Sequence, residues 1–227
     1  MSSFDGTNPV AMGCRVVPVS PRGLRWASKA ALGGTPQQDP QLGMFSGHRT
    51  RNTYNGQMSS IFLLGFMASG KTTLARVLAK RCNLGIVDLD ETIEEASGES
   101  VAEIIRSRGE CVFRELEYRT LRLCPDGVVI SAGGGCFVSE DVRTYLRESG
   151  ILSIFLDLPW ECLARRAAAQ AADRPLWKSE KQARRLFESR IPLYKQADII
   201  LKLEGHETPE DILDLLLDRI PEYTCAT

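Results

Sequence analysis

SIFLLGFMASGKTTLARVLAKRC, residues 60–82, joins a short apolar run to a segment of helical period through a glycine-rich loop. The loop contains the pattern G-x-x-x-x-G-K-T, and a strand before it and a helix after it are the setting in which this pattern binds phosphate. Its glycines let successive backbone N–H groups turn toward phosphate oxygens at the positive end of a helix. A plain glycine turn would not require Lys-Thr at that offset, so the stretch predicts a nucleotide site in an α/β fold.

This loop is expected to supply most of the contacts to the nucleotide. Lys71 would bring a positive charge to the outer phosphates, and we count it as catalytic, while Thr72 can offer its hydroxyl to Mg²⁺. ATP and Mg²⁺ are therefore the expected co-substrate and cofactor. The predicted nucleotide-binding residues of the loop are Gly65, Ala68, Ser69, Gly70, Lys71, Thr72 and Thr73.

Strands and helices alternate through the rest of the chain. Because βαβ units close right-handed and place helices on both faces of the sheet, the pattern predicts a three-layer α/β/α fold around a five-stranded parallel sheet. Capping boxes at Ser100 and Ser179 mark two helix starts, and Thr208 before a proline marks a third. The predicted strands are residues 60–64, 86–89, 128–132, 151–156 and 198–203.

The overall composition narrows the class of protein. The 227 residues include 28 basic and 29 acidic side chains, a balance that argues against a dedicated nucleic-acid binder. No apolar run is long enough to span a bilayer, so neither nucleic acid nor membrane is an expected partner. The seven cysteines are scattered without metal-ligand spacing, which favours a reduced, cytoplasmic setting. We expect a monomer that acts on small molecules.

Residues 1–57 differ from the rest of the chain in composition. They hold 13 of the 30 glycines and prolines and carry a net charge of +4. No helical or strand period is sustained there, so we expect a disordered leader before a catalytic domain of residues 58–227. Two origins stay open: a start codon assigned upstream of Met58, or a real tail such as a transit peptide, which would place the protein in a plastid.

Asp88 and Asp90, in IVDLDET, lie at the end of the second predicted strand. Side chains two apart on a strand point the same way, here toward the carboxyl edge of the sheet, where open α/β sheets bind ligands. Two carboxylates at one edge repel unless they have separate tasks, which suggests one beside Mg²⁺ and one on an acceptor hydroxyl. The alternative is that Asp90 caps the helix that follows.

Two arginines are candidates for binding an anionic substrate. Arg114 and Glu117 fall three apart on one helix face, where the carboxylate can hold the guanidinium toward an anion. Arg190 lies in ESRIPLYK, on a helix with several basic positions. Taken alone, either arginine could equally be a solvated surface charge.

VVISAGGGCF, residues 128–137, runs a buried strand straight into three glycines. Such a run weakens packing and adds entropy to the unfolded chain, so something must approach the backbone closely there. A flexible turn would need one glycine rather than three. Cys136, which follows the glycines, is expected to be a buried structural thiol.

Six motifs, in this order and at these spacings, resemble the shikimate kinase family: G-x-x-x-x-G-K-T, D-x-D, F-R-x-x-E, G-G-G, R-P-L and R-x-P-L-Y. The resemblance covers residues 59–215 and no part of the leader. It implies a P-loop fold of the nucleoside-monophosphate-kinase type, with strand order 2-3-1-4-5. It also implies transfer of the γ-phosphate of ATP to the 3-hydroxyl of shikimate, a step in the biosynthesis of chorismate and the aromatic amino acids.

The resemblance also implies roles for the charged residues. Asp88 would assist Mg²⁺ through water, with Ser131 as a further candidate at the metal. Asp90 would bind the reacting hydroxyl and accept its proton. Arg114 and Arg190 would clamp the carboxylate of shikimate.

The same resemblance places a lid around residues 168–180. Arg174, in R-P-L, would reach the transferring phosphoryl group from this lid and act as a third catalytic residue. Arg166 and Pro209 match family positions that flank the adenine. The residues against which the flat ring would lie, in the absence of any Cβ, are Gly133, Gly134 and Gly135.

The sequence departs from the family pattern at Ala68, where the family often has glycine. A methyl group is tolerable there only if the backbone is not left-handed. Two other functions remain as alternatives: a small-metabolite kinase similar to gluconate kinase, which would not need two arginines on a carboxylate, and a binding domain that has lost activity. The second predicts loss of Lys71, Asp90 or Arg114, and all three are present.

Overall fold

The computed structural model describes residues 59–169 and 179–220. The predicted leader, residues 1–57, and Arg174 of the predicted lid lie outside the described residues.

The central element is a five-stranded sheet in which all neighbouring strands run parallel, in the order β2-β3-β1-β4-β5. This confirms the predicted strand order, and every strand begins and ends within one residue of its predicted bounds. The inner strand β1 is completely buried, because helices cover both faces of the sheet. The strands are β1 Ile61–Leu64, β2 Gly85–Asp88, β3 Val128–Ser131, β4 Leu152–Asp157 and β5 Ile199–Lys202.

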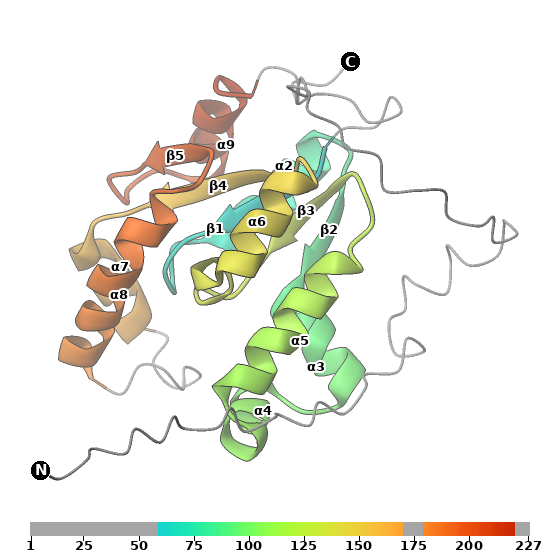
Figure 1. Ribbon diagram of the computed structural model, residues 1–227. Helices are drawn as coiled ribbons and strands as arrows, with labels where there is room; N and C mark the ends of the chain where they lie inside the picture. The colour runs from blue at the N-terminus through green and yellow to red at the C-terminus, as the bar shows by residue number, and fades with distance from the viewer. Residues whose placement is uncertain (1–58, 170–178, 221–227) are drawn as a thin grey trace, which may run out of the picture.

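The helices connect these strands and fall into separate groups (Figure 1). Figure 1 shows α3, α4 and α5 gathered in one group, while α7 and α8 lie side by side at a distance from it. Helix α2 packs against α9 and β3. The helices are α2 Lys71–Arg81, α3 Leu89–Ser97, α4 Val101–Arg108, α5 Glu110–Arg122, the 3-10 turn η2 Cys136–Val138, α6 Glu140–Glu148, α7 Trp160–Ala168, α8 Glu180–Tyr194 and α9 Pro209–Leu217.

The predicted helix starts at Ser100, Ser179 and Thr208 are confirmed. Ser100 forms a full capping box with Glu103 at the start of α4, and Thr208 forms one at the start of α9. Ser179 accepts a hydrogen bond from the backbone N–H of Gln182, which is one of the two bonds of the predicted capping box. These caps pair backbone donors that the first turn of a helix leaves without partners.

In the part of the chain that the structure describes, apolar side chains form two separate cores. The larger core lies on both faces of the sheet. The smaller core joins α3, α4 and α5 through Ile93, Ile104, Val112, Phe113 and Leu116. Asp90 and Arg114 lie on two of these three helices, so the smaller core fixes their positions relative to each other. Among the residues that the structure describes, none of the helices has both the length and the apolar composition that a membrane span needs.

Candidate active site

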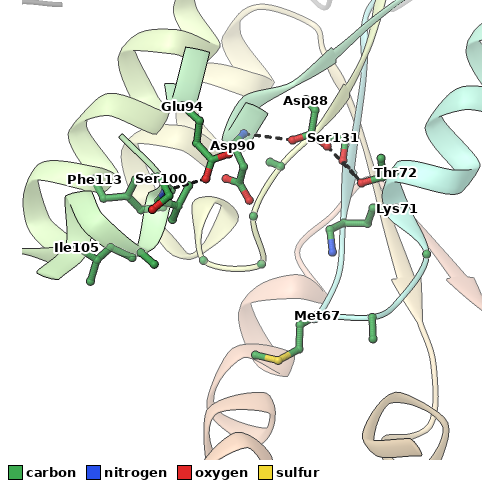
Figure 2. Close-up of a pocket in the computed structure, with 18 of the residues that line it drawn as sticks. Met67, Lys71, Thr72, Asp88, Asp90, Glu94, Ser100, Ile105, Phe113 and Ser131 are labelled. Atoms are coloured by element: carbon green, nitrogen blue, oxygen red, sulfur yellow. Dashed lines mark hydrogen bonds between the residues drawn. The ribbon is translucent and has the colours of Figure 1, made fainter. Parts of the chain in front are cut away.

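A cavity of about 830 Å³ opens at the carboxyl edge of the sheet. The P-loop borders it on one side, α3 to α5 on another, and the three glycines after β3 form part of its wall. Figure 2 shows the side chains of Lys71 and Asp90 pointing into the same space from opposite sides. The cavity therefore gathers the candidate residues of several separate motifs in one place.

The P-loop begins directly after β1 and ends at the N-terminus of α2. Gly70 is the N-cap of that helix. The Lys71 ammonium donates to the carbonyl oxygens of Gly65 and Phe66 at 3.1 and 3.0 Å. Its charge and the positive end of the α2 dipole thus lie together beside the loop. Of the predicted nucleotide-binding residues, Ala68, Gly70, Lys71, Thr72 and Thr73 line the cavity, whereas Gly65 and the buried Ser69 form the loop behind them.

The backbone at Ala68 is left-handed, with a φ of 62°. The expectation that this alanine avoids the left-handed region is therefore wrong. The loop has to turn sharply between a strand and a helix, and that requirement outweighs the preference of the side chain. An L-residue with a Cβ pays on the order of 1 kcal/mol for this conformation.

Ala68→Gly is expected to raise the free energy of unfolding by about 0.5–1 kcal/mol, since glycine adopts a positive φ without the steric cost of a Cβ. Urea denaturation without nucleotide would measure the change. Ala164→Gly, inside α7, is the matched control and should lower the same quantity by about 1 kcal/mol. A loss of stability in Ala68→Gly would show that the alanine is not strained.

Three oxygen-bearing side chains meet beside the P-loop. The Thr72 hydroxyl donates to Asp88 Oδ2 at 3.2 Å and lies 3.3 Å from Ser131 Oγ. Register places Asp88 next to Ser131 on neighbouring strands. Hydroxyl and carboxylate oxygens are the donors that Mg²⁺ prefers, so this set fits that ion. In residues 59–169 and 179–220, no group of three or more His, Cys, Asp or Glu side chains is placed to hold a metal.

Asp88 and Asp90 do not lie on one strand as predicted. Strand β2 ends at Asp88, and α3 begins at once with Leu89, so Asp90 occupies the first turn of a helix. Asp88, and not Asp90, is the N-cap: its Oδ1 accepts from the N–H groups of Asp90 and Glu91 at 3.2 and 3.4 Å. An aspartate can satisfy these free donors directly after a strand, which shortens the turn. Both aspartates still line the cavity.

The side chain of Asp90 is half-buried, and its carboxylate is poorly compensated. Its Oδ1 has no hydrogen-bond partner among the described residues. Burial, together with the negative charge of Asp88, raises the pKa of Asp90 to about 6, although Lys71 and Arg114 act in the opposite direction. A buried acceptor without a donor is suited to a hydroxyl group that a ligand would bring.

Arg114 and Glu117 form a sheltered pair on α5. Arg114 Nη1 donates to Glu117 Oε2 at 2.5 Å, and its Nη2 donates to Glu110 Oε1 at 2.6 Å. The Glu117 side chain is only 1% exposed, so the solvated surface pair that the sequence left open is excluded. Burial raises the pKa of Glu117 to about 7, against the effect of the Arg114 guanidinium. The two carboxylates hold the guanidinium at the edge of the cavity.

Side chains of the protein itself lie close to the three glycines, where a Cβ would otherwise be. A Cβ on Gly135 would overlap the Arg114 guanidinium. A Cβ on Gly133 would lie 3.1 Å from Asp90 Oδ1 and equally close to an oxygen of Glu117. The ring expected to lie against these glycines is therefore not the whole reason for them, because charged side chains of the site occupy part of the same space.

The remaining candidates lie around the same cavity or beside it. Arg190 is buried on α8 and borders the cavity together with Arg114 and Lys71. Arg166 on α7 also lines it and donates to the carbonyl of Gly205 at 2.9 Å. Pro209 begins α9 and does not line this cavity.

Sequence reasoning missed several residues of the cavity wall. Glu94 borders the cavity and accepts from the N–H of Val101 at 2.8 Å, which ties α3 to α4. Val101, Ile105 and Phe113 supply an apolar side. Phe113 precedes Arg114 in F-R-x-x-E and could have been noticed, whereas the others look like ordinary helix positions. Cys136 is buried as expected, and burial raises its pKa well above the ordinary value.

Several known proteins of similar sequence share one description. A family model described as shikimate kinase matches residues 67–221. The chain is 36% identical over 165 residues to a shikimate kinase of Persephonella marina, covering 72% of this chain and 99% of that protein. It is 34% identical over 160 residues to one of Aquifex aeolicus, covering 69% and 93%.

Solved structures agree in fold. A shikimate kinase from Bacteroides thetaiotaomicron superposes with a TM-score of 0.65 at 32% identity, over 72% of this chain and 98% of that one. A shikimate kinase from Acinetobacter baumannii, solved in complex with shikimate, gives 0.66 at 27% identity, over 72% and 93%.

Proposed function

The chain belongs to the shikimate kinase family, and from this membership and the cavity we infer that it transfers the γ-phosphate of ATP to the 3-hydroxyl of shikimate. The products are shikimate 3-phosphate and ADP. One observation carries the assignment to these residues: Lys71, Asp90, Arg114 and Arg190 all line the same cavity.

We propose the following roles in the transfer. The substrate oxygen forms a bond to the γ-phosphorus, the bond from that phosphorus to the β–γ bridging oxygen breaks, and ADP leaves. Asp90 accepts the hydrogen bond of the attacking hydroxyl and then its proton. Lys71 and, by family resemblance, Arg174 offset the charge that develops on the phosphoryl oxygens. The reaction therefore depends on positioning and charge, with no covalent intermediate on the protein.

Mg²⁺ is part of the same proposal. Thr72 would bind the ion through its hydroxyl, Asp88 would reach it through water, and Ser131 lies close enough to join them. When bound, the ion would neutralise charge between the outer phosphates.

Binding of shikimate is assigned to the two arginines and the glycines. Arg114, oriented by Glu117, and Arg190 would pair with the ring carboxylate. The ring would lie beside Gly133 and Gly134. Arg166 and Pro209 are proposed to flank the adenine.

ADP release by the purified full chain tests this function. With Mg-ATP we expect turnover on shikimate and none above background on gluconate, which lacks a rigid ring to hold a carboxylate opposite one hydroxyl. Quinate, a related carboxylated ring, tests how narrowly the pocket selects. Turnover on gluconate alone would replace the assignment by a gluconate-type kinase, and ligand binding without turnover on any alcohol would favour an inactive binding domain.

A further inference from the structure

Tyr194 is the final residue of α8 and the last residue of the R-x-P-L-Y motif, and it takes no direct part in the proposed transfer. It is completely buried. Its ring packs against Phe155 of β4, with the ring centroids 5.2 Å apart. It lies one helical turn after Arg190, on the same face of the helix.

The side chain of Tyr194 reaches beyond its own helix, and its hydroxyl donates a hydrogen bond to the carbonyl oxygen of Gly134. Burial raises the pKa of Tyr194, so the hydroxyl keeps its proton at neutral pH and acts as the donor. The Arg190 guanidinium lies near the same hydroxyl, and its charge opposes the effect of burial on the pKa of Tyr194. One buried hydroxyl thus lies beside both the arginine of α8 and the glycine loop after β3.

Gly134 has close neighbours on more than one element at this junction. A Cβ built on it would lie 3.2 Å from the Tyr194 hydroxyl, 3.4 Å from Arg190 Nη1 and 3.1 Å from the carbonyl oxygen of Gly65 in the P-loop. Gly134 therefore lies between α8 and the P-loop.

The hydrogen bond also fixes which way the loop presents its backbone. No peptide bond in the described part of the chain is cis. In a trans peptide the C=O and N–H point in opposite directions, so the Gly135 N–H must point away from Tyr194. The carbonyl of Gly133 is occupied as well, because it accepts from the N–H of Cys136 at 3.0 Å. Two carbonyls of the loop are thus engaged within the protein.

We propose that Tyr194 is a positioning residue for the acceptor substrate, which holds the Gly134–Gly135 peptide and the Arg190 guanidinium in the arrangement that binds an anionic, hydroxylated ring. The proposal rests on the function proposed above. A positioning role predicts a change in the KM for shikimate and none in the KM for ATP, whereas a purely structural role predicts no such difference.

Tyr194→Phe tests the proposal, since phenylalanine keeps the ring packing and removes only the hydroxyl. In the full chain we expect the KM for shikimate to rise about tenfold, while the KM for ATP stays within about twofold and kcat within about threefold. A KM does not depend on the fraction of enzyme that is folded, so partial loss of folded protein does not obscure the result.

Ser153→Ala is the matched control. Ser153 is buried near the start of β4, far from the carboxyl edge, and its hydroxyl donates to Asp198 Oδ2 at 2.7 Å. Its loss should lower the free energy of unfolding and leave both KM values unchanged. If Tyr194→Phe behaves in the same way, the role of Tyr194 is structural and the proposal is wrong.

A second measurement needs no substitution and covers the case in which the variant does not fold. In the parent protein, shikimate should shift the amide NMR signals of Gly134 and Gly135. Unchanged signals with shikimate bound would overturn the proposal. A parent enzyme that neither binds nor phosphorylates shikimate would instead contradict the proposed function.

Discussion

Asp90→Asn is expected to lower kcat at least about a hundredfold while the affinity for ATP stays near that of the parent. Asparagine has nearly the same shape as aspartate, but it cannot accept the proton of the attacking hydroxyl. Steady-state kinetics with shikimate, together with calorimetric titration of ATP, would separate the two effects. Glu91→Gln, at an exposed position one residue further along α3, is the control and should keep full turnover. A kcat within about tenfold of the parent would remove Asp90 from the chemical step.

The same variant should be more stable than the parent above pH 6. Because the folded-state pKa of Asp90 is raised from 3.8 to about 6, the folded protein holds this proton more tightly than the unfolded chain. Below pH 3.8 Asp90 is protonated in both the folded and the unfolded state, so its ionisation does not lower the free energy of unfolding there. As the pH rises toward 6, ionisation of Asp90 lowers the free energy of unfolding more and more, and above pH 6 this effect is constant. Two pKa units correspond to about 3 kcal/mol, and asparagine mimics the protonated carboxyl.

Unfolding in urea at pH 4 and pH 8, without nucleotide and with a chelator, would measure this difference. The stability gain of Asp90→Asn should be present at pH 8 and nearly absent at pH 4. An equal gain at both pH values would mean that the ionisation of Asp90 is not the cause. A variant that is less active but more stable than the parent is expected where a functional site contains a buried charged group.

The fold could be predicted from the sequence because its signals are local. Each strand is a short apolar run bounded by polar or turn residues, and each lies within one residue of its expected bounds. The P-loop pattern and the capping residues Ser100 and Thr208 likewise depend on neighbours only a few positions away. Such signals need no knowledge of tertiary contacts.

The details of the site could not be predicted because they arise between distant segments. The glycine of residue 135 is required by Arg114, which is 21 positions earlier in the chain. The left-handed backbone at Ala68 follows from the path of the P-loop rather than from alanine itself. Similarly, Asp88 became a helix cap because α3 starts sooner than the strand pattern indicated.

Gly135→Ala is expected to raise the KM for shikimate about thirtyfold without unfolding the protein. The backbone at Gly135 has φ −92° and ψ −18°, a conformation that alanine adopts easily. Its Cβ, however, would lie within 2.6 Å of Arg114 Nη1 and closer still to Nη2. The guanidinium lies at the end of a flexible side chain and would move away, so its charge-assisted bond to the substrate carboxylate is lost, an effect of about 2 kcal/mol.

The reason for this effect can be tested with Arg114→Ala and the double variant. If Gly135→Ala acts only by displacing Arg114, it should raise the KM for shikimate hardly at all once the arginine is gone. The KM for ATP should stay within about twofold of the parent value in all three variants, because the P-loop is untouched. Independent, additive effects would instead mean that the ring itself contacts Gly135, as the sequence suggested. The cycle therefore distinguishes a glycine that makes room for an arginine from a glycine that makes room for the substrate.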